Sequence, residues 1–123
     1  MNVLSRVLQR FRYPVTLPQD ITSALGIKLA DSLTFDEFLH QLCTPSWQPS
    51  RLKRWMPRSQ AEEAFSQAQR KERFGENSVF SYYFSQGWVI FILRFDNMSR
   101  LRNLELRHEK IEQENGVQIP LPT

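Results

Sequence analysis

The side chains best able to do chemistry lie on one expected helix in the first half of the chain. His40 and Cys43 are three residues apart, so a helix places them on one face and within reach of each other. A nucleophilic cysteine needs a lowered thiol pKa. Cys43 stands at the C-terminal end of this helix, where the helix dipole disfavours a thiolate. We therefore expect Cys43 to be a buried structural residue and the protein not to be an enzyme.

Metal and phosphate sites are not indicated either. His40 and His108 have no further histidine or cysteine at the spacing of metal ligands. The four glycines are far apart, which excludes a glycine-rich phosphate-binding loop. The acidic pairs Asp36–Glu37 and Glu62–Glu63 are explained as first-turn acids that favour helix N-termini. We expect no cofactor and no metal, and we identify no small-molecule substrate.

The segment 47–58 alternates aromatic and basic residues. Its members are Trp47, Arg51, Lys53, Arg54, Trp55 and Arg58. Cations interleaved with aromatic rings bind phosphates, stacked bases or anionic lipid. In the other interpretation, both tryptophans pack on the core and the cations stay in solvent. The second hypothesis of function is therefore binding of nucleic acid or of an anionic membrane surface. Its contacts would be Arg51, Lys53, Arg54 and Arg58.

Residues 1–74 are expected to be mainly helical. An apolar stripe at helical spacing predicts an amphipathic helix over 3–11, and a short helical turn is compatible with 19–25. The clearest helix begins at Thr34, because Thr34 and Glu37 form a capping box.

A further helix is expected before the first strand. Ser59 and Glu62 repeat the spacing of a capping box. Three alanines and Phe65 then give an apolar stripe, and Gly75 is the expected C-terminal stop.

The pattern changes to alternation at Val79. Strands are expected over 79–85 and 88–96, joined by a two-residue turn at Gln86–Gly87, and a third strand over 100–108. This turn places Ser85 opposite Trp88. One face of the hairpin is then wholly apolar or aromatic and predicts the core side. Its members are Phe80, Tyr82, Phe84, Val89, Phe91, Leu93 and Phe95.

The second face of the hairpin is also partly hydrophobic. Its members are Val79, Ser81, Tyr83, Trp88, Ile90, Ile92 and Arg94. An antiparallel sheet usually keeps one side in solvent, so this hydrophobicity needs an explanation. Either the N-terminal helix or the C-terminal tail covers this face, or it is an interface for a partner or a second copy. The candidate partner-binding residues are Tyr83, Trp88, Ile90 and Ile92, together with Trp47 and Trp55 from the loop.

Size and composition fit one small domain. The chain has 123 residues, of which 41% are hydrophobic, and a net charge of +3. We expect one α+β domain over 1–108, with its helical part over 1–74 and its strands over 79–108, followed by a tail of limited order over 109–123. A single cysteine excludes an internal disulfide and is typical of a reducing compartment, so a cytoplasmic location is expected.

Several motifs, taken in order, suggest a family. They are Leu33–Phe38 (LTFDEF), Leu42–Pro45 (LCTP), the hairpin over Tyr82–Asp96 and the strand Arg100–Leu106. Over about residues 33–107 this order resembles the small ααβββ fold of the SmpA/OmlA (BamE-like) outer-membrane assembly lipoproteins, without their lipoprotein signal. The resemblance implies a non-enzymatic scaffold that binds proteins.

These observations give one prediction of fold and one leading hypothesis of function. The predicted fold is α+β, with two or three helices packed on one face of a three-stranded antiparallel β-meander. The leading hypothesis is a non-catalytic protein-interaction module, such as an adaptor, a chaperone-like factor or an assembly factor. It would bind a protein partner, or a second copy of itself, through its sheet face or through the Trp/Arg-rich loop.

Overall fold

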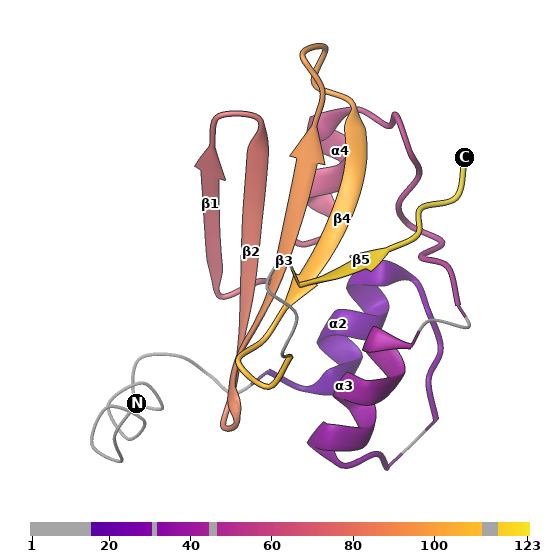
Figure 1. Cartoon of the computed structure of the whole chain (residues 1–123), viewed down its shortest axis with the longest axis vertical. Helices are drawn as coiled ribbons and strands as arrows, with labels where there is room; N and C mark the ends of the chain where they lie inside the picture. Colours follow the sequence, from indigo (N-terminus) through magenta and orange to yellow (C-terminus); the bar gives the residue numbers. More distant parts are fainter. Residues whose placement is uncertain (1–15, 31, 45–46, 112–115) are drawn as a thin grey trace.

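The computed structural model describes residues 16–30, 32–44, 47–111 and 116–123. Within these residues, three helices precede a five-stranded antiparallel sheet (Figure 1). The helices are α2 (Pro18–Leu25), α3 (Phe35–Cys43) and α4 (Arg58–Glu63). The strands are β1 (Arg70–Phe74), β2 (Asn77–Phe84), β3 (Gly87–Phe95), β4 (Leu101–Arg107) and β5 (Val117–Ile119). The helix expected over 3–11 lies outside the described residues.

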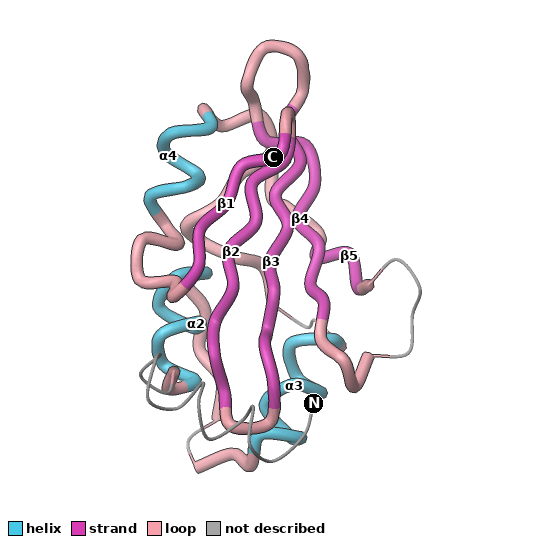
Figure 2. Tube along the Cα trace, turned by 90° about the vertical axis from the view of Figure 1, so that its left-hand side faces the viewer, coloured by secondary structure: helices cyan, strands magenta, loops and turns pink. Residues whose placement is uncertain are grey.

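The strands lie side by side in the order in which they occur in the chain (Figure 2). The predicted three-stranded meander with helices packed on one face is therefore wrong, because the sheet has five strands and makes up most of the regular secondary structure. The missed strands lie at its two edges, β1 beside β2 and β5 beside β4.

Strand β1 replaces the second half of the helix expected after Ser59. Helix α4 ends at Glu63, and Arg70–Phe74 pairs with β2 from Arg70 opposite Ser81 to Phe74 opposite Asn77. The sequence RKERF has no alternation of its own and is exposed at four of its five positions. Pairing with β2 makes it a strand, because backbone groups at a sheet edge need hydrogen-bond partners.

Strand β5 lies in the segment expected to be a tail of limited order. Val117–Ile119 pairs with Leu104–Leu106 of β4, and both Ile119 and Leu121 are buried. The expectation of limited order is therefore wrong for this segment. Val117–Ile119 forms a strand here because the edge of β4 offers backbone hydrogen bonds and a core that the Ile119 side chain can enter.

The hairpin of β2 and β3 keeps its predicted faces in a different register. Tyr83 lies opposite Trp88, and the turn is Ser85–Gln86 rather than Gln86–Gly87. The pairing differs from the expected one by two residues, so every side chain stays on its predicted face. Gly87 has a φ of +127°, which favours glycine at the first position after the turn.

All seven residues of the predicted core face are buried. They form one hydrophobic cluster with side chains of the three helices. Ring contacts join the two halves of the molecule: Phe65, just after α4, stacks on Phe80 with centroids 5.0 Å apart, and Phe38 of α3 lies 6.0 Å from Phe84. We call this face of the sheet the inner face, and the opposite one the outer face.

The helix over 35–43 forms as predicted. The Thr34 side chain accepts a hydrogen bond from the Glu37 backbone N–H, and the Glu37 carboxylate accepts one from the Thr34 N–H. These two bonds satisfy backbone donors that a helix N-terminus otherwise leaves unpaired. The hydrogen bonds with Thr34 also hold the pKa of Glu37 below its ordinary value.

The segment before α4 covers the rest of the β4 edge. The Trp55 N–H donates to the Leu101 carbonyl at 2.6 Å, the Leu101 N–H donates to Met56 at 2.9 Å, and Pro57 forms a bridge with Arg100. An uncovered edge invites pairing with other chains, and here β5 and this segment share the task of covering it. The basic-aromatic segment is thereby placed beside the turn between β3 and β4.

Candidate interaction surfaces

The outer face brings together the predicted partner-binding residues of the hairpin. Ile90 and Ile92 of β3 are half-buried, as is Trp88, whereas Tyr83 is fully buried. The Tyr83 and Trp88 rings meet edge to face with centroids 5.3 Å apart. The Arg70 guanidinium lies 5.7 Å from the Trp88 ring centroid. The outer face is therefore only partly buried, and its aromatic and aliphatic side chains are accompanied by a charged one.

A carboxylate buried in the outer face is a feature that sequence reasoning missed. Glu105 lies opposite Ile92 and is 2% exposed. Its carboxylate accepts hydrogen bonds from Arg107 Nε at 2.6 Å and from Gln118 Nε2 at 2.9 Å, and it forms an ion pair with Arg94 at 3.5 Å. A buried charge needs this degree of pairing to be tolerated. The network ties β3, β4 and β5 together.

The sequence alone indicates on which face Glu105 lies, but not its partners in this network. Glu105 alternates with Leu104 and Leu106, which places it on the face opposite to the core. Its partners Arg94 and Gln118 come from other strands, so they are identified only once the strand register is known.

A hollow of about 340 Å³ opens beside Ile90 of the outer face. It is lined by Trp88, Ile90, Arg107, His108, Glu109, Ile111 and Gly116. The lining combines apolar side chains with groups of both charges, which suits a side chain of a protein partner better than a purely apolar ligand.

His108 is buried at the end of β4 that adjoins α3. Its ring lies 5.2 Å from that of Phe35, and its Nδ1 accepts a hydrogen bond from the Lys110 N–H at 3.0 Å. Within the described residues, its Nε2 has no hydrogen-bond partner. Burial lowers the pKa of His108, because it disfavours the charged imidazolium. This shift favours the neutral form of the ring at the junction between helix and sheet.

The basic-aromatic segment divides into an internal part and an exposed part. Trp47 packs against the core, and its indole N–H donates to the Gln41 carbonyl at 3.1 Å. Arg51 is exposed and donates to the Ser23 carbonyl at 3.2 Å, at the side of α2. The placement of Trp47 agrees with the core-packing interpretation for that residue.

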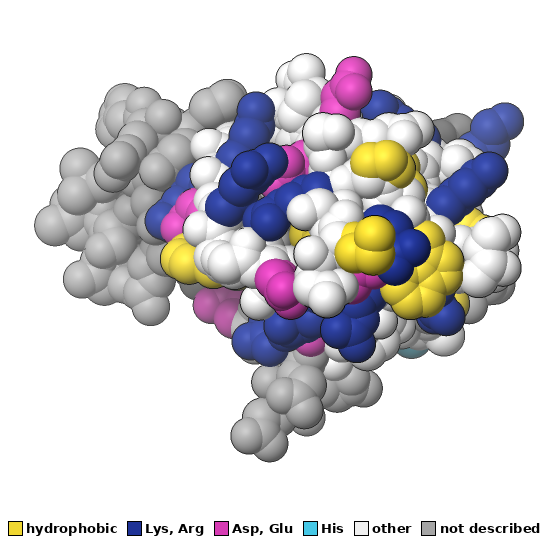
Figure 3. Space-filling model, turned by 90° about the horizontal axis from the view of Figure 1, so that it is seen from above, with side chains coloured by type: hydrophobic (Ala, Val, Ile, Leu, Met, Phe, Trp, Pro, Cys, Tyr) yellow, Lys and Arg dark blue, Asp and Glu magenta, His cyan; other side chains and the backbone are white. Residues whose placement is uncertain are grey.

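Lys53, Arg54 and Trp55 are exposed at the end of the sheet where the β1–β2 and β3–β4 turns lie. Figure 3 views this end and shows hydrophobic and basic side chains side by side. The guanidinium of Arg100 lies 5.5 Å from the Trp55 ring centroid. For Trp55, then, the core-packing interpretation does not hold.

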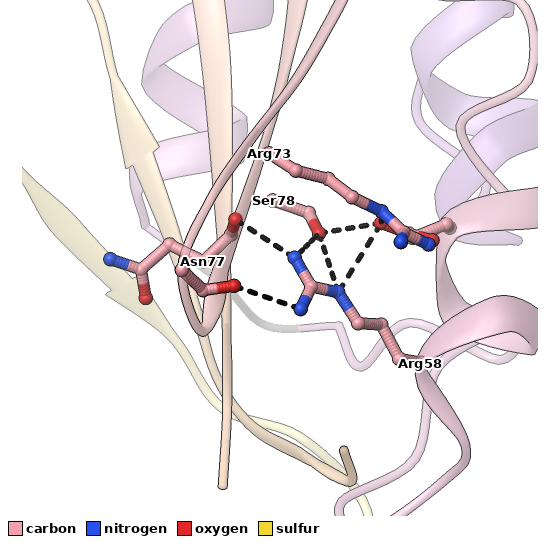
Figure 4. A network of polar contacts seen from close by, with 6 residues as sticks. Arg58, Arg73, Asn77 and Ser78 are labelled. Carbon is pink, nitrogen blue, oxygen red and sulfur yellow. Dashed lines mark hydrogen bonds and ion pairs between the residues drawn. The ribbon is translucent and has the colours of Figure 1, made fainter. Parts of the chain in front are cut away.

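Arg58 is used inside the fold rather than for an external anion (Figure 4). Its guanidinium donates to the carbonyls of Gly75 at 2.9 Å and Asn77 at 3.1 Å, and to the Ser78 hydroxyl at 3.0 Å. It also lies 3.5 Å from the Glu62 carboxylate. This arginine fastens α4 to the β1–β2 turn, and its guanidinium is engaged by groups of the fold.

Glu62 completes the same network. Its carboxylate accepts hydrogen bonds from the Ser78 hydroxyl at 2.6 Å and from the Arg73 guanidinium. Burial alone would raise the pKa of Glu62, but the hydrogen bonds from Arg73 and Ser78 lower it below its ordinary value. Arg58, Glu62, Arg73 and Ser78, which come from α4, β1 and β2, thus form one polar junction between helix and hairpin.

The pair considered for nucleophilic chemistry is not activated. Cys43 is half-buried and packs against the core, and burial raises the pKa of its thiol. A nucleophilic cysteine needs the opposite shift. His40, on the same helix, is exposed.

The described residues contain no group of three or more side chains suited to hold a metal ion. A helix with the length and apolar character needed to cross a membrane is likewise absent from this part of the chain.

Comparisons of the chain with protein-family models, with curated proteins and with solved structures gave no match. The resemblance to the SmpA/OmlA lipoproteins therefore stays a prediction.

Proposed function

We propose that this protein is a non-catalytic interaction module that binds a protein partner through the outer face of its sheet. The observation that carries this proposal is the row formed by Ile90 and Ile92 on the outer face. Both stay half-buried, because the described helices pack their apolar side chains on the inner face instead. Hydrophobic side chains left at the surface of a sheet mark interaction sites.

The charges around this row indicate the chemistry of the partner. Arg70, Arg94 and Arg107 keep 51%, 38% and 42% of their side chains exposed. Glu72 pairs with Arg70 at 3.4 Å, Glu105 is buried between the other two arginines, and the exposed Glu109 lines the hollow beside Ile90. Because Glu105 does not reach solvent, three arginines and two acids form the solvent-exposed rim. This cationic excess favours a partner segment that carries apolar side chains flanked by carboxylates.

The same charges argue against a second copy as the partner. A two-fold contact centred on Ile90 and Ile92 would bring two cationic rims together, and facing like charges weaken an interface. An acidic partner segment instead gains charge complementarity from the rim. A homodimer remains one outcome of the test.

The test uses synthetic peptides in which apolar residues alternate with glutamate, and matched peptides with lysine in place of glutamate. We expect the glutamate peptides to bind and the lysine peptides not to bind. Ile90→Asp should weaken binding by about tenfold or more, because it places a charge in the centre of the contact. Leu17→Asp is the matched control, since Leu17 is an exposed aliphatic residue outside the sheet.

Light scattering and thermal unfolding accompany the binding measurement. A variant Ile90→Asp that melts like the wild type and has lost peptide binding supports the proposal. Equal binding of both peptide sets, or no effect of Ile90→Asp, would contradict it. A wild-type dimer that Ile90→Asp converts to a monomer would replace the proposed partner by a second copy.

A further inference from the structure

Three exposed hydrophobic side chains lie at one end of the molecule. Trp55 is 49% exposed, Phe74 57% and Met98 68%. Among the described residues, the one other large hydrophobic side chain exposed in this way is Leu17, before α2. The end-on view in Figure 3 shows hydrophobic side chains among basic and other polar ones. Exposed large hydrophobics are therefore concentrated at this end rather than scattered.

The sheet topology explains why these three residues lie at the same end. Phe74 ends β1 at its turn into β2, and Met98 lies in the turn between β3 and β4. In an antiparallel sheet with strands in chain order, these two turns lie at the same end (Figure 1). Trp55 joins them because its backbone N–H is bonded to Leu101, the first residue of β4.

The Trp55 side chain is exposed to solvent, and its backbone has an unfavourable conformation. Its φ is +73°, in the left-handed region that bulky residues rarely adopt. Neighbouring groups fix it there: its N–H donates to the Leu101 carbonyl, and Arg100 lies over its ring. Strained residues of this kind cluster at functional sites. This strain is an observation independent of the exposure of the ring.

The charges of this end favour an anionic partner. Its exposed cations are Lys53, Arg54, Arg100 and Arg102. Arg100 pairs with Asp96 at 3.0 Å, so this pair adds no net charge, and Glu62 pairs with two arginines. The exposed acids nearby are Glu76 in the β1–β2 turn and Glu63, which lines a hollow with Lys53. Lys53, Arg54 and Arg102 therefore outnumber the acids that face solvent.

We propose that this end docks on an anionic lipid bilayer. The turn-tip surface, as we call it, consists of Trp55, Phe74, Met98, Lys53, Arg54, Arg100 and Arg102. The three hydrophobic tips would enter the headgroup region, while the cations would contact anionic headgroups.

A flat bilayer suits this surface better than a nucleic acid does. The hydrophobic tips stand on three separate segments at the end of the sheet, and a planar surface touches all three at once. Single-stranded nucleic acid is bound by aromatic rings that stack successive bases along a groove. Met98, the most exposed of the three, has no ring on which a base could stack.

The test is co-sedimentation of the full chain with phosphatidylserine-containing vesicles and with pure phosphatidylcholine vesicles. We expect binding to the anionic vesicles alone, and weaker binding at high salt. The double variant Lys53→Ala/Arg54→Ala should weaken binding more than tenfold, since each cation near an anionic surface contributes about fivefold.

Two single variants separate docking from folding. Met98→Asp should abolish vesicle binding, whereas Leu17→Asp, equally exposed before α2, should bind as the wild type does. Trp55→Gly should also lose binding while its melting temperature is kept or raised, because glycine adopts a φ of +73° without strain. A purely structural Trp55 would show the reverse, with binding intact and the protein destabilised.

Three results would overturn this inference. They are no binding to phosphatidylserine vesicles, unchanged binding of Met98→Asp, and a single-stranded oligonucleotide that binds and displaces the vesicles. The last result would assign this surface to nucleic acid. The inference does not depend on the proposed partner face, because Ile90→Asp should leave vesicle binding unchanged.

Discussion

The two faces of the β2–β3 hairpin carry similar residues and have different environments. On the inner face, phenylalanines and leucines are fully buried under the helices. On the outer face, Ile90 and Ile92 are half-buried among arginines and a paired carboxylate. The difference shows that hydrophobicity alone does not decide burial. What decides it is whether another element has apolar side chains to place on that face.

The largest expected effect compares neighbouring residues on opposite faces. Leu93→Ala should lower the free energy of unfolding by about 2–5 kcal/mol, because Leu93 is fully buried and its loss leaves a cavity. Ile92→Ala should cost about 1 kcal/mol, because solvent can fill the space. Urea unfolding of both variants measures the difference.

Equal losses for the two variants would mean that the outer face is packed like a core. The comparison between the faces would then fail, and with it the main support for a partner on the outer face.

The next effect concerns the buried carboxylate. Glu105→Gln should lower the free energy of unfolding by about 1–3 kcal/mol, because charge-assisted hydrogen bonds to Arg107 and Gln118 are weakened. Glu105→Met should cost less, because an apolar residue of similar size needs no pairing and the arginines can reach solvent. Chemical denaturation of both variants tests this order. If Glu105→Met is the more damaging change, the ion pairs stabilise the outer face more than an apolar contact would.

The smallest expected effect is a pH dependence at the junction of sheet and helix. The pKa of His108 is lowered in the folded state, so the unfolded chain binds the proton more readily. The contribution of His108 to stability is complete above its unfolded pKa of about 6.5 and is lost as the pH falls towards its folded pKa. Asp36 of α3 and Glu109 oppose this shift, and Lys110 adds to it.

Thermal unfolding between neutral and mildly acidic pH should therefore show a loss of stability that His108→Gln reduces. An identical pH profile for this variant would show that other groups cause the acid sensitivity. In that event the pH dependence of unfolding would not measure the packing of His108 against Phe35 between sheet and helix.

Local sequence signals predicted the elements whose causes are themselves local. The helix over 35–43 follows from the capping box of Thr34 and Glu37. The two faces of the hairpin follow from alternation, which survived a wrong turn position because the pairing differed by two residues. The residues of the segment 47–58 fall into two groups. Trp55 is exposed, whereas Trp47, Arg51 and Arg58 form hydrogen bonds within the fold.

The edges of the sheet were not predictable in the same way. Arg70–Phe74 and Val117–Ile119 have weak strand patterns, and each becomes a strand because a neighbouring strand offers unpaired backbone groups. The Glu105 network and the turn-tip surface share this origin, since their members come from segments far apart in the chain.

Neighbouring residues in the sequence therefore set the composition of the two faces, the clearest helix and the position of Cys43 at its C-terminal end. Tertiary structure decided the number of strands, the partners of the buried carboxylate and the gathering of Trp55, Phe74 and Met98 at one end. The physical reason is the range of the forces involved. Capping and alternation act between residues close in sequence, whereas edge pairing and ion pairing depend on which strands the fold brings together.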